Sequence, residues 1–579
     1  MKAKTRTKKT AYHEISNDQE YRIVDDPRYI GLQCINPKTD YTVCGTPLDT
    51  SDPDHIYMDL RKGHVLIVGS TGSGKSRRYF IPHILLKSKC GHSMIINDPK
   101  GELYNYTAGT LAQNGYKIWS FNTREPQISD CWPIFYPAFE LYKSEDPLKQ
   151  CKAREIIHSI ASTVCPIQGK EAFWYISGQN VFDGGAELLM AYKDDPSDIN
   201  FNNIMEYIEK IVESPQSRYE FNHEGSINSI CHQKLAPTVN TSEITQRSII
   251  GTLTNCVAPY ITSPPIQHIT SNEGIRFEDL IGGKVAIFLI TPDENETYNP
   301  LVSVFVETAY EYLLRRAYDY GGSLPVDIHF ILDEFGLMTY IPSMSRMLSA
   351  GRSRNIWFNL SVQSMDQILS VHGMDAESIK GNCSTWIFFR SRSLSTLTEI
   401  SLLCGDDEYG RSRYSVTDLQ SLRNDLGEVL IMRQGVMPYI GCLKDFTSID
   451  CFSTIPEPPI KEPIDFSAII KKDARNEAME SPNAKILTDL SNLLTALGHG
   501  GGISKDMEGS CDHLIGLLGN VNTGMDLLSI IDDILNEDDP KELHQRMSWM
   551  YDGLDNNYAS FQSVYTEIRN AFKFRKNSR

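Results

Sequence analysis

The sequence predicts an α/β fold in which a parallel sheet is covered by helices on both faces. Short, unbroken apolar runs alternate with helix-like segments, as expected for strands that are buried on both sides. The first of these runs, Val65–Val68, leads directly into a glycine-rich loop, Gly69–Ser76. A strand that enters such a loop and continues as a helix is typical of α/β proteins that bind phosphate groups.

The expected strands fall into two groups separated by a long helical stretch. Strands are predicted at 65–68, 93–98, 117–121, 285–290, 328–332, 356–362, 385–389 and 428–432. Between about 140 and 270 the apolar spacing is helical, for example in 152–164, 173–192 and 201–212, and no convincing strand occurs. One sheet interrupted once by an inserted all-α domain is the economical interpretation.

Composition limits the classes of protein that this chain can represent. At 579 residues it needs several domains. Its 13 cysteines form no C-x-x-C pair, which argues against a disulfide framework or a zinc site. A net charge of −18 argues against a protein that coats nucleic acid over its whole surface, but not against a ring with a basic lumen. Neither a membrane span nor a secretory signal is expected.

The glycine-rich loop carries the strongest chemical signal. It fits the pattern G-x-x-x-x-G-K-S/T with the residues Gly69, Ser70, Thr71, Gly72, Ser73, Gly74, Lys75 and Ser76. Backbone N–H groups of such a loop wrap phosphates, and the following helix adds its positive end. Lys75 is then expected to reach the β- and γ-phosphates of a nucleoside triphosphate, and the Ser76 hydroxyl to bind Mg²⁺.

An acidic pair at the end of a later strand supplies the expected partner. Asp333 and Glu334 directly follow the apolar strand 328–332. Asp333 is predicted to hold Mg²⁺ through its water, and Glu334 to act as the general base for the attacking water. Alone, this pair would be read as ordinary surface acids, but its combination with the loop Gly69–Ser76 favours the functional interpretation. His329, within the strand, is expected to be a packed or hydrogen-bonded neighbour and not a catalyst.

Two further polar residues are weaker candidates. Gln363 ends the strand 356–362, where it can contact the γ-phosphate or the attacking water. Arg352 is suited to reach the nucleotide of a neighbouring subunit and stabilise the transition state. A strand-end amide and a solvated arginine turn explain them equally well. The segment Asp98–Glu102 is best read as a charged turn, and Phe173-Trp174 as core packing.

Together these residues resemble the conjugative coupling-protein ATPases of type IV secretion, the TraG/TraD family. The resemblance covers roughly residues 60–450. Its specific marks are Thr71–Lys75, Asp98–Glu102, Leu332–Phe335, Ile341-Pro342, Gly351–Ser353 and Gln363-Ser364. The resemblance implies a RecA-like P-loop NTPase with an inserted all-α domain, assembled as a homo-hexameric ring that uses ATP and Mg²⁺ to move DNA or its attached relaxase.

The resemblance also implies roles, partners and a location. Family members usually begin with transmembrane helices, so a soluble variant or a separate membrane anchor is expected, at the inner face of the bacterial cell membrane. The expected partners are the relaxase, the transferred single-stranded DNA, other type IV secretion ATPases and that anchor. The implied site residues are Lys75 and Ser76 for phosphate and Mg²⁺, Asp333 and Glu334 as the acidic pair, Gln363 as sensor and Arg352 as a trans-acting finger.

These observations predict five segments and leave two alternatives open. The segments are an arm at 1–55, a nucleotide-binding domain at 56–138 and 276–455, an all-α domain at 139–275, and an acidic helical extension at 456–579. The extension is either a docking site or a solvated appendage, with helices expected at 486–497, 525–535 and 560–574. An FtsK-like translocase of double-stranded DNA and a non-motor receptor scaffold are the alternative functions.

Overall fold

The computed structural model describes residues 32–36, 45–52, 54–169, 171–213, 229–292, 296–449, 452 and 455–467. The chain divides into two compact units, residues 1–464 and 465–579. The helices expected at 486–497, 525–535 and 560–574 lie outside the described residues, as does the basic N-terminus. The architecture below therefore concerns the first unit.

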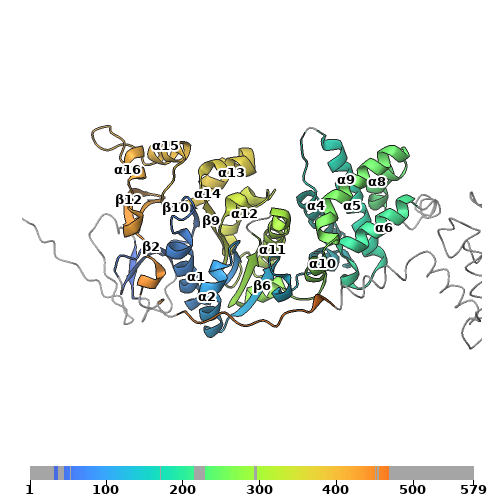
Figure 1. Ribbon diagram of the computed structural model, residues 1–579, viewed down its shortest axis with the longest axis horizontal. Coiled ribbons are helices and arrows are strands. Elements are labelled where there is room, and N and C mark those ends of the chain that lie inside the picture. Colours follow the sequence, from blue (N-terminus) through green and yellow to red (C-terminus); the bar gives the residue numbers. More distant parts are fainter. Residues whose placement is uncertain are drawn as a thin grey trace, which may run out of the picture. The chain divides into compact units, whose positions relative to one another are not determined.

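Among the described residues, nine strands form one sheet in the order β12-β11-β10-β4-β9-β8-β5-β7-β6 (Figure 1). The strands from β10 to β6 are parallel, and β11 and β12 are antiparallel additions at one edge. This confirms the predicted α/β class. The bounds are β4 His64–Val68, β5 Ser93–Asn97, β6 Lys117–Asn122, β7 Val285–Ile290, β8 Ile328–Leu332, β9 Ile356–Val362, β10 Cys383–Phe388, β11 Glu428–Arg433 and β12 Val436–Cys442.

Strand register brings several strand ends to one edge of the sheet. Val68 pairs with Val362 between β4 and β9, and Leu332 pairs with Asn97 between β8 and β5. Each of these strands is parallel to its neighbours, so their carboxyl ends meet at the same edge. The residues that follow β4, β5, β8 and β9 are therefore neighbours in space although they are far apart in sequence.

Helices cover both faces of the sheet and form two hydrophobic cores. Leu66 and Val68 of β4 belong to one core, whereas Val65 and Ile67 belong to the other, as the alternation of a strand requires. The helices of this part are α1 Ile81–Lys89, α2 Glu102–Gln113, α11 Asn299–Asp319, α12 Met344–Gly351, α13 Met365–His372, α14 Ala376–Asn382, α15 Leu394–Leu403 and α16 Val416–Gln420.

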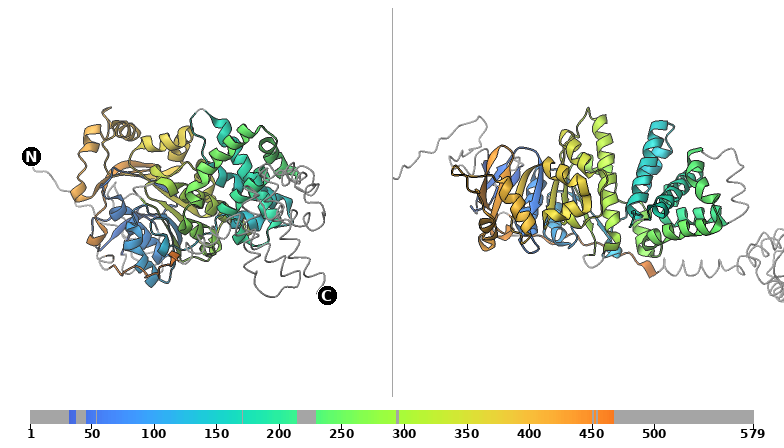
Figure 2. Two further views of the ribbon diagram at one scale, coloured as in Figure 1. Left: turned by 45° about the vertical axis from the view of Figure 1, so that its right-hand side comes forward. Right: turned by 90° about the horizontal axis from the view of Figure 1, so that it is seen from above.

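A group of helices follows β6 and gathers beyond that edge of the sheet, next to α11 (Figure 1 and Figure 2). Its members are α3 Tyr136–Tyr142, α4 Pro147–Val164, α5 Ala172–Tyr192, α6 Phe201–Glu213, α8 Ser229–Val239, α9 Glu243–Ile261 and α10 Pro264–Ser271. No strand is assigned to the described residues between β6 and β7. Trp174 packs against the core, but the side chain of Phe173 is 58% exposed, so core packing was the wrong expectation for Phe173.

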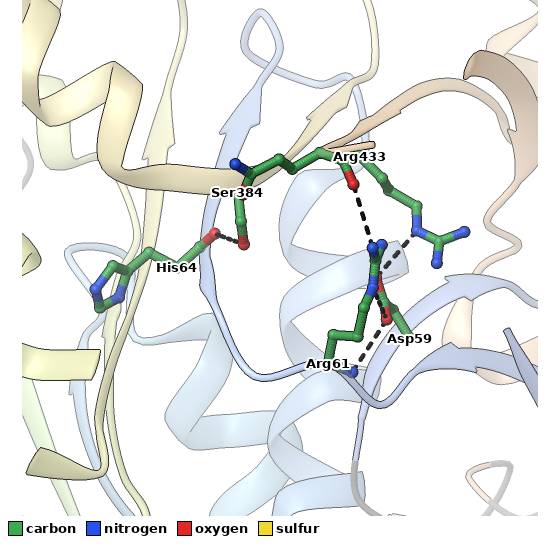
Figure 3. A network of polar contacts seen from close by, with 6 residues as sticks. Asp59, Arg61, His64, Ser384 and Arg433 are labelled. Carbon is green, nitrogen blue, oxygen red and sulfur yellow. Dashed lines mark hydrogen bonds and ion pairs between the residues drawn. The ribbon is translucent and has the colours of Figure 1, made fainter. Parts of the chain in front are cut away.

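A small antiparallel sheet adjoins the β12 edge of the large one. It consists of β1 Gln33–Ile35, β3 Ile56–Asp59 and β2 Thr46–Asp49, in that order. The backbone N–H of Thr50 donates to the carbonyl of Cys442, 2.8 Å away. In the connection between the sheets, Asp59 accepts hydrogen bonds from Arg61 and from the buried Arg433 of β11 (Figure 3). The described residues before 56 thus form a β element with the segment that follows them.

The proline-rich segment 455–464, which we call the strap, lies on the first unit. The sequence assigned these residues to the C-terminal extension, from Pro456 onward, whereas the compact unit extends to Ile464. The backbone N–H of Ile464 donates to the carbonyl of Gln127 at 2.7 Å. Lys461 pairs with Asp130, and its ammonium donates to the Ser120 hydroxyl at 2.9 Å. Prolines mark a stiff extended segment here, not the end of the folded unit.

Gly109 of α2 allows the strap to approach, and its replacement tests that contact. A Cβ at this position would lie 2.2 Å from the carbonyl oxygen of Pro456, which is backbone and cannot rotate away. Gly109→Ala should displace the strap and make trypsin cleave after Lys461 several-fold faster than in the parent chain. The matched control is Gly251→Ala on α9, where a Cβ meets no atom within 4 Å. Equal cleavage rates in all three proteins would contradict this docking.

Candidate active site

The glycine-rich loop connects β4 to a short helical turn at Ser76–Phe80, which continues into α1. Gly72 and Gly74 have φ angles of 73° and 94°, in the left-handed region that favours glycine. The loop is anchored by two backbone hydrogen bonds: Gly69 N–H donates to Val362 O at 3.0 Å, and Ser70 N–H donates to Arg390 O at 2.7 Å. The ends of β9 and β10 therefore fix the loop on either side of β4.

The Lys75 ammonium and the Ser73 hydroxyl are polar groups inside this loop that can bind a ligand. Lys75 is buried, and its ammonium donates to the carbonyl of Gly69 at 2.6 Å. Burial lowers the pKa of Lys75, while the charges of Glu334 and Asp333 act in the opposite direction. The hydroxyl of Ser73 is buried without a hydrogen-bond partner. An orphaned hydroxyl and a buried ammonium within a loop of backbone N–H groups fit a phosphate chain.

Ser76 and Asp333 join the loop to the acidic pair. The Ser76 hydroxyl donates to Asp333 Oδ2 at 3.0 Å, although the residues are 257 positions apart in sequence. Burial raises the pKa of Asp333, the charge of Glu334 raises it further, and Lys75 opposes both. Asn97 at the end of β5 donates from Nδ2 to the backbone carbonyl of Asp333 at 2.6 Å. A hydroxyl and a carboxylate are oxygen ligands of the kind that Mg²⁺ prefers, so the residues present fit this ion.

Glu334 is held in an unusual backbone conformation. Its φ angle of 54° lies in the left-handed region, which is uncommon outside glycine and often marks functional sites. Gln363 donates from Nε2 to Glu334 Oε2 at 3.1 Å, and Lys100 Nζ lies 3.8 Å from Oε1. Thr71, Lys100, Glu334 and Gln363 line one cavity. The structure thus brings Glu334 and Gln363 together beside the glycine-rich loop.

Arg352 lies near the amino ends of the parallel strands, whereas the other candidate site residues lie at their carboxyl ends. It follows α12 and precedes β9, whereas Gln363 follows β9, so the two residues flank opposite ends of one strand. The side chain of Arg352 is exposed, and its charge contributes to lowering the pKa of His64 at the start of β4, after burial as the main cause. Within one chain, Arg352 is not part of the group formed by Lys75, Asp333 and Glu334.

The sequence underrated the segment 98–102. Its turn is present, with Gly101 at a φ angle of 72°, but the turn also carries side chains into the site. Asp98 is 2% exposed and accepts from the backbone N–H of Tyr104 at 2.7 Å. Burial raises its pKa to about 7. The available signal was position, since Asp98 follows β5 just as Asp333 follows β8, its neighbour in the sheet.

The raised pKa of Asp98 predicts a pH-dependent stability. Because the folded-state pKa lies above the ordinary value of 3.8, the protonated carboxyl stabilises the fold at low pH, and this contribution is lost as the pH rises through 7. The free energy of unfolding of the parent, minus that of Asp98→Asn, should fall by ~2 kcal/mol between about pH 5.5 and 8.5. Urea denaturation measures it, with Glu125→Gln as the control, an exposed acid after β6. A difference that stays flat with pH would contradict the assignment.

His329 behaves as the sequence predicts. It is buried in β8, and its Nε2 lies 3.0 Å from Nδ1 of His92, with the two rings stacked. Burial first, followed by the charges of Lys87 and His92, lowers its pKa well below the ordinary value. His329 lies near the amino end of β8, whereas the acidic pair follows the carboxyl end of this strand. It is therefore a packed neighbour and not a catalyst.

Comparison with known proteins identifies the family. Residues 15–423 match the family model for conjugative DNA transfer in the type IV secretory system. The chain belongs to this family. No curated protein sequence matches it. No helix among the residues that the structure describes is both long and apolar enough to cross a lipid bilayer.

Solved structures of coupling proteins share the fold of this family member. The unbound monoclinic form of the bacterial conjugative coupling protein TrwBdeltaN70 aligns with a TM-score of 0.52 at 13% identity, over 73% of this chain and 91% of that one. The plasmid coupling protein TrwB in complex with the non-hydrolysable ATP analogue ADPNP aligns with a TM-score of 0.50 at 14% identity, over 69% and 88%. At such identities the likeness establishes the fold alone.

Proposed function

We propose that this chain is an ATP-hydrolysing coupling protein that recruits a relaxase–DNA complex and drives its transfer through a type IV secretion channel. Family membership supplies the conjugative context. The observation that carries the ATPase is the 3.0 Å contact between Ser76 and Asp333, which closes the glycine-rich loop against the acidic pair. The structure with an ATP analogue, in a protein of the same fold, supports a nucleoside triphosphate as the ligand.

Binding of ATP follows from the residues around the loop. The backbone N–H groups of Gly72–Ser76 and the buried ammonium of Lys75 bind the phosphates, for which Lys75 gives up its contact with the Gly69 carbonyl. Ser76 and Asp333 would hold Mg²⁺, which neutralises phosphate charge when bound. Asn97 keeps Asp333 in place through its backbone carbonyl.

Hydrolysis depends on Glu334 as the general base. Its carboxylate accepts the proton of the attacking water, while Gln363, already bonded to Glu334, orients that water. Lys100 Nζ lies 3.8 Å from Oε1 of Glu334 and places a positive charge beside this carboxylate. The strained backbone of Glu334 sets the direction in which its carboxylate points.

Arg352 acts across a subunit interface in this proposal. Because it lies at the amino end of β9, it reaches a nucleotide only in a neighbouring copy. A ring of six copies satisfies this requirement for every site. The proposed partners are the relaxase, single-stranded DNA, other type IV secretion ATPases and a membrane-anchor protein. Binding to that anchor would locate the protein at the inner face of the cell membrane.

ATP hydrolysis by purified protein, with and without single- and double-stranded DNA, tests this function. Single-stranded DNA is expected to stimulate the turnover of ATP. Stimulation by double-stranded DNA alone would instead indicate a duplex translocase. Normal transfer of substrate in cells that carry only Glu334→Gln would indicate a receptor scaffold and overturn the motor.

Mixing two inactive variants tests Arg352 separately. Arg352→Ala and Glu334→Gln subunits are each expected to be inactive alone. In a mixture, some interfaces combine an intact Arg352 with an intact Glu334, and hydrolysis should be partly restored. Turnover per subunit should also rise with protein concentration. Failure of both results would exclude a trans-acting role for Arg352.

A further inference from the structure

Helix α11 carries a polar residue at every fourth position along one face: Asn299, Ser303, Glu307 and Glu311. Residues four positions apart in a helix lie one above another, so these side chains form a stripe. We call it the α11 stripe. It begins beside the site, where Asn299 lines the same cavity as Glu334, and continues toward α4.

The first three residues of the stripe bind the segment that follows Glu334. Asn299 Nδ2 donates to the carbonyl of Leu337 at 3.3 Å. Ser303 donates to the carbonyl of Thr339 at 3.1 Å and accepts from the Thr339 hydroxyl at 2.7 Å. The Ser343 hydroxyl donates to Glu307 Oε1 at 2.7 Å. These contacts run in register from just after the strained Glu334 to the start of α12.

Glu307 also binds the group of helices beyond the sheet. Its second oxygen, Oε2, accepts from the hydroxyl of Ser159 on α4 at 2.5 Å. Glu311 pairs with Lys152, one turn further along, at 2.9 Å. The carboxylate of Glu307 is buried, so each hydroxyl bond is a charge-assisted bond that is costly to leave unmade. One buried carboxylate therefore joins the segment after Glu334 to α4.

We propose that Glu307 is a positioning residue that transmits the state of the nucleotide site to α4. This inference rests on the proposed function, because it requires nucleotide binding to shift Glu334. A shift of Glu334 moves the segment 335–343, whose end is held by Glu307 through Ser343. Because the same carboxylate holds Ser159, α4 follows. Coupling of this kind needs a contiguous set of contacts, which the hydrogen bonds of Glu307 supply, and a second arrangement of the segment 335–343, which the inference requires when nucleotide binds.

Hydrogen exchange with and without ADPNP and Mg²⁺ tests the coupling. The parent is expected to show changed exchange in both 335–343 and α4 when the analogue binds. Ser159→Ala should keep the change in 335–343 and reduce the α4 response about fivefold or more, while the analogue still binds. The control is Ser162→Ala, also on α4, whose hydroxyl donates to the carbonyl of Ser159 and not to Glu307.

Three results would overturn the inference. The first is an α4 response that persists in Ser159→Ala and also in Ser343→Ala, which breaks the contact from the other side. The second is a parent that binds ADPNP without any response in α4. The third is a parent that fails to bind ADPNP, which refutes the proposed function as well. Calorimetric titration of the same samples separates the third result from the first two.

Discussion

Glu334→Gln is expected to lower ATP turnover by about 10²–10⁴-fold while ATP binding is retained. The amide keeps the shape of the side chain and can still bond to Gln363, but it cannot accept a proton from water at neutral pH. The phosphate-binding residues Lys75 and Ser76 are untouched by this change. The loss should therefore appear in kcat and leave KM nearly unchanged.

Steady-state kinetics and a binding titration with ADPNP check this prediction. The matched control is Glu102→Gln, an exposed acid at the same edge of the sheet, which should keep parental turnover. If Glu334→Gln hydrolysed ATP within a few fold of the parent, another residue would be the base. If it lost binding instead, Glu334 would be part of the binding pocket and its role in the proposal would be wrong.

The parallel sheet was predictable because its strands are buried on both faces and read as unbroken apolar runs. β12 was missed because Val436–Cys442 contains Pro438 and Gly441 and lies at the sheet edge, where an unbroken apolar run is not required. The strap was assigned to the wrong unit because prolines usually mark a linker. The contacts of Pro456 with Gly109, of Lys461 with Asp130 and of Ile464 with Gln127 show that the chain continues along the first unit.

The site was predictable where a motif fixes both spacing and context. The loop and the acidic pair meet as expected from a strand end facing a glycine-rich turn. Asp98 and Asn97 were not predicted as site residues because their importance depends on strand order, which places β5 next to β8. The link from Glu307 to Ser159 joins residues 148 positions apart on two helices, a pairing that no local pattern encodes.

The largest expected loss of stability comes from Asp59. Its carboxylate lies 3.0 Å from Nε of Arg433, and neither side chain is more than 3% exposed. Burial raises the pKa of Asp59, but the hydrogen bond from Arg61 and the charge of Arg433 outweigh it, so the pKa lies below its usual value. The ionised carboxylate therefore stabilises the fold above the ordinary pKa of 3.8, and this contribution is lost as the pH falls through the lower folded-state pKa.

Asp59→Ala should accordingly lower the free energy of unfolding at pH 7 by ~3–5 kcal/mol, because it leaves the buried guanidinium of Arg433 without its carboxylate. Urea denaturation followed by circular dichroism measures the loss. The control is Asp425→Ala, which removes the carboxylate of the exposed ion pair Arg423–Asp425. It should leave the denaturation midpoint nearly unchanged. The double variant Asp59→Leu with Arg433→Met should recover much of the stability, since the cost arises from a buried guanidinium that has lost the Asp59 carboxylate. Equal losses in the single and double variants would show that packing of Asp59, and not its charge, holds the two sheets together.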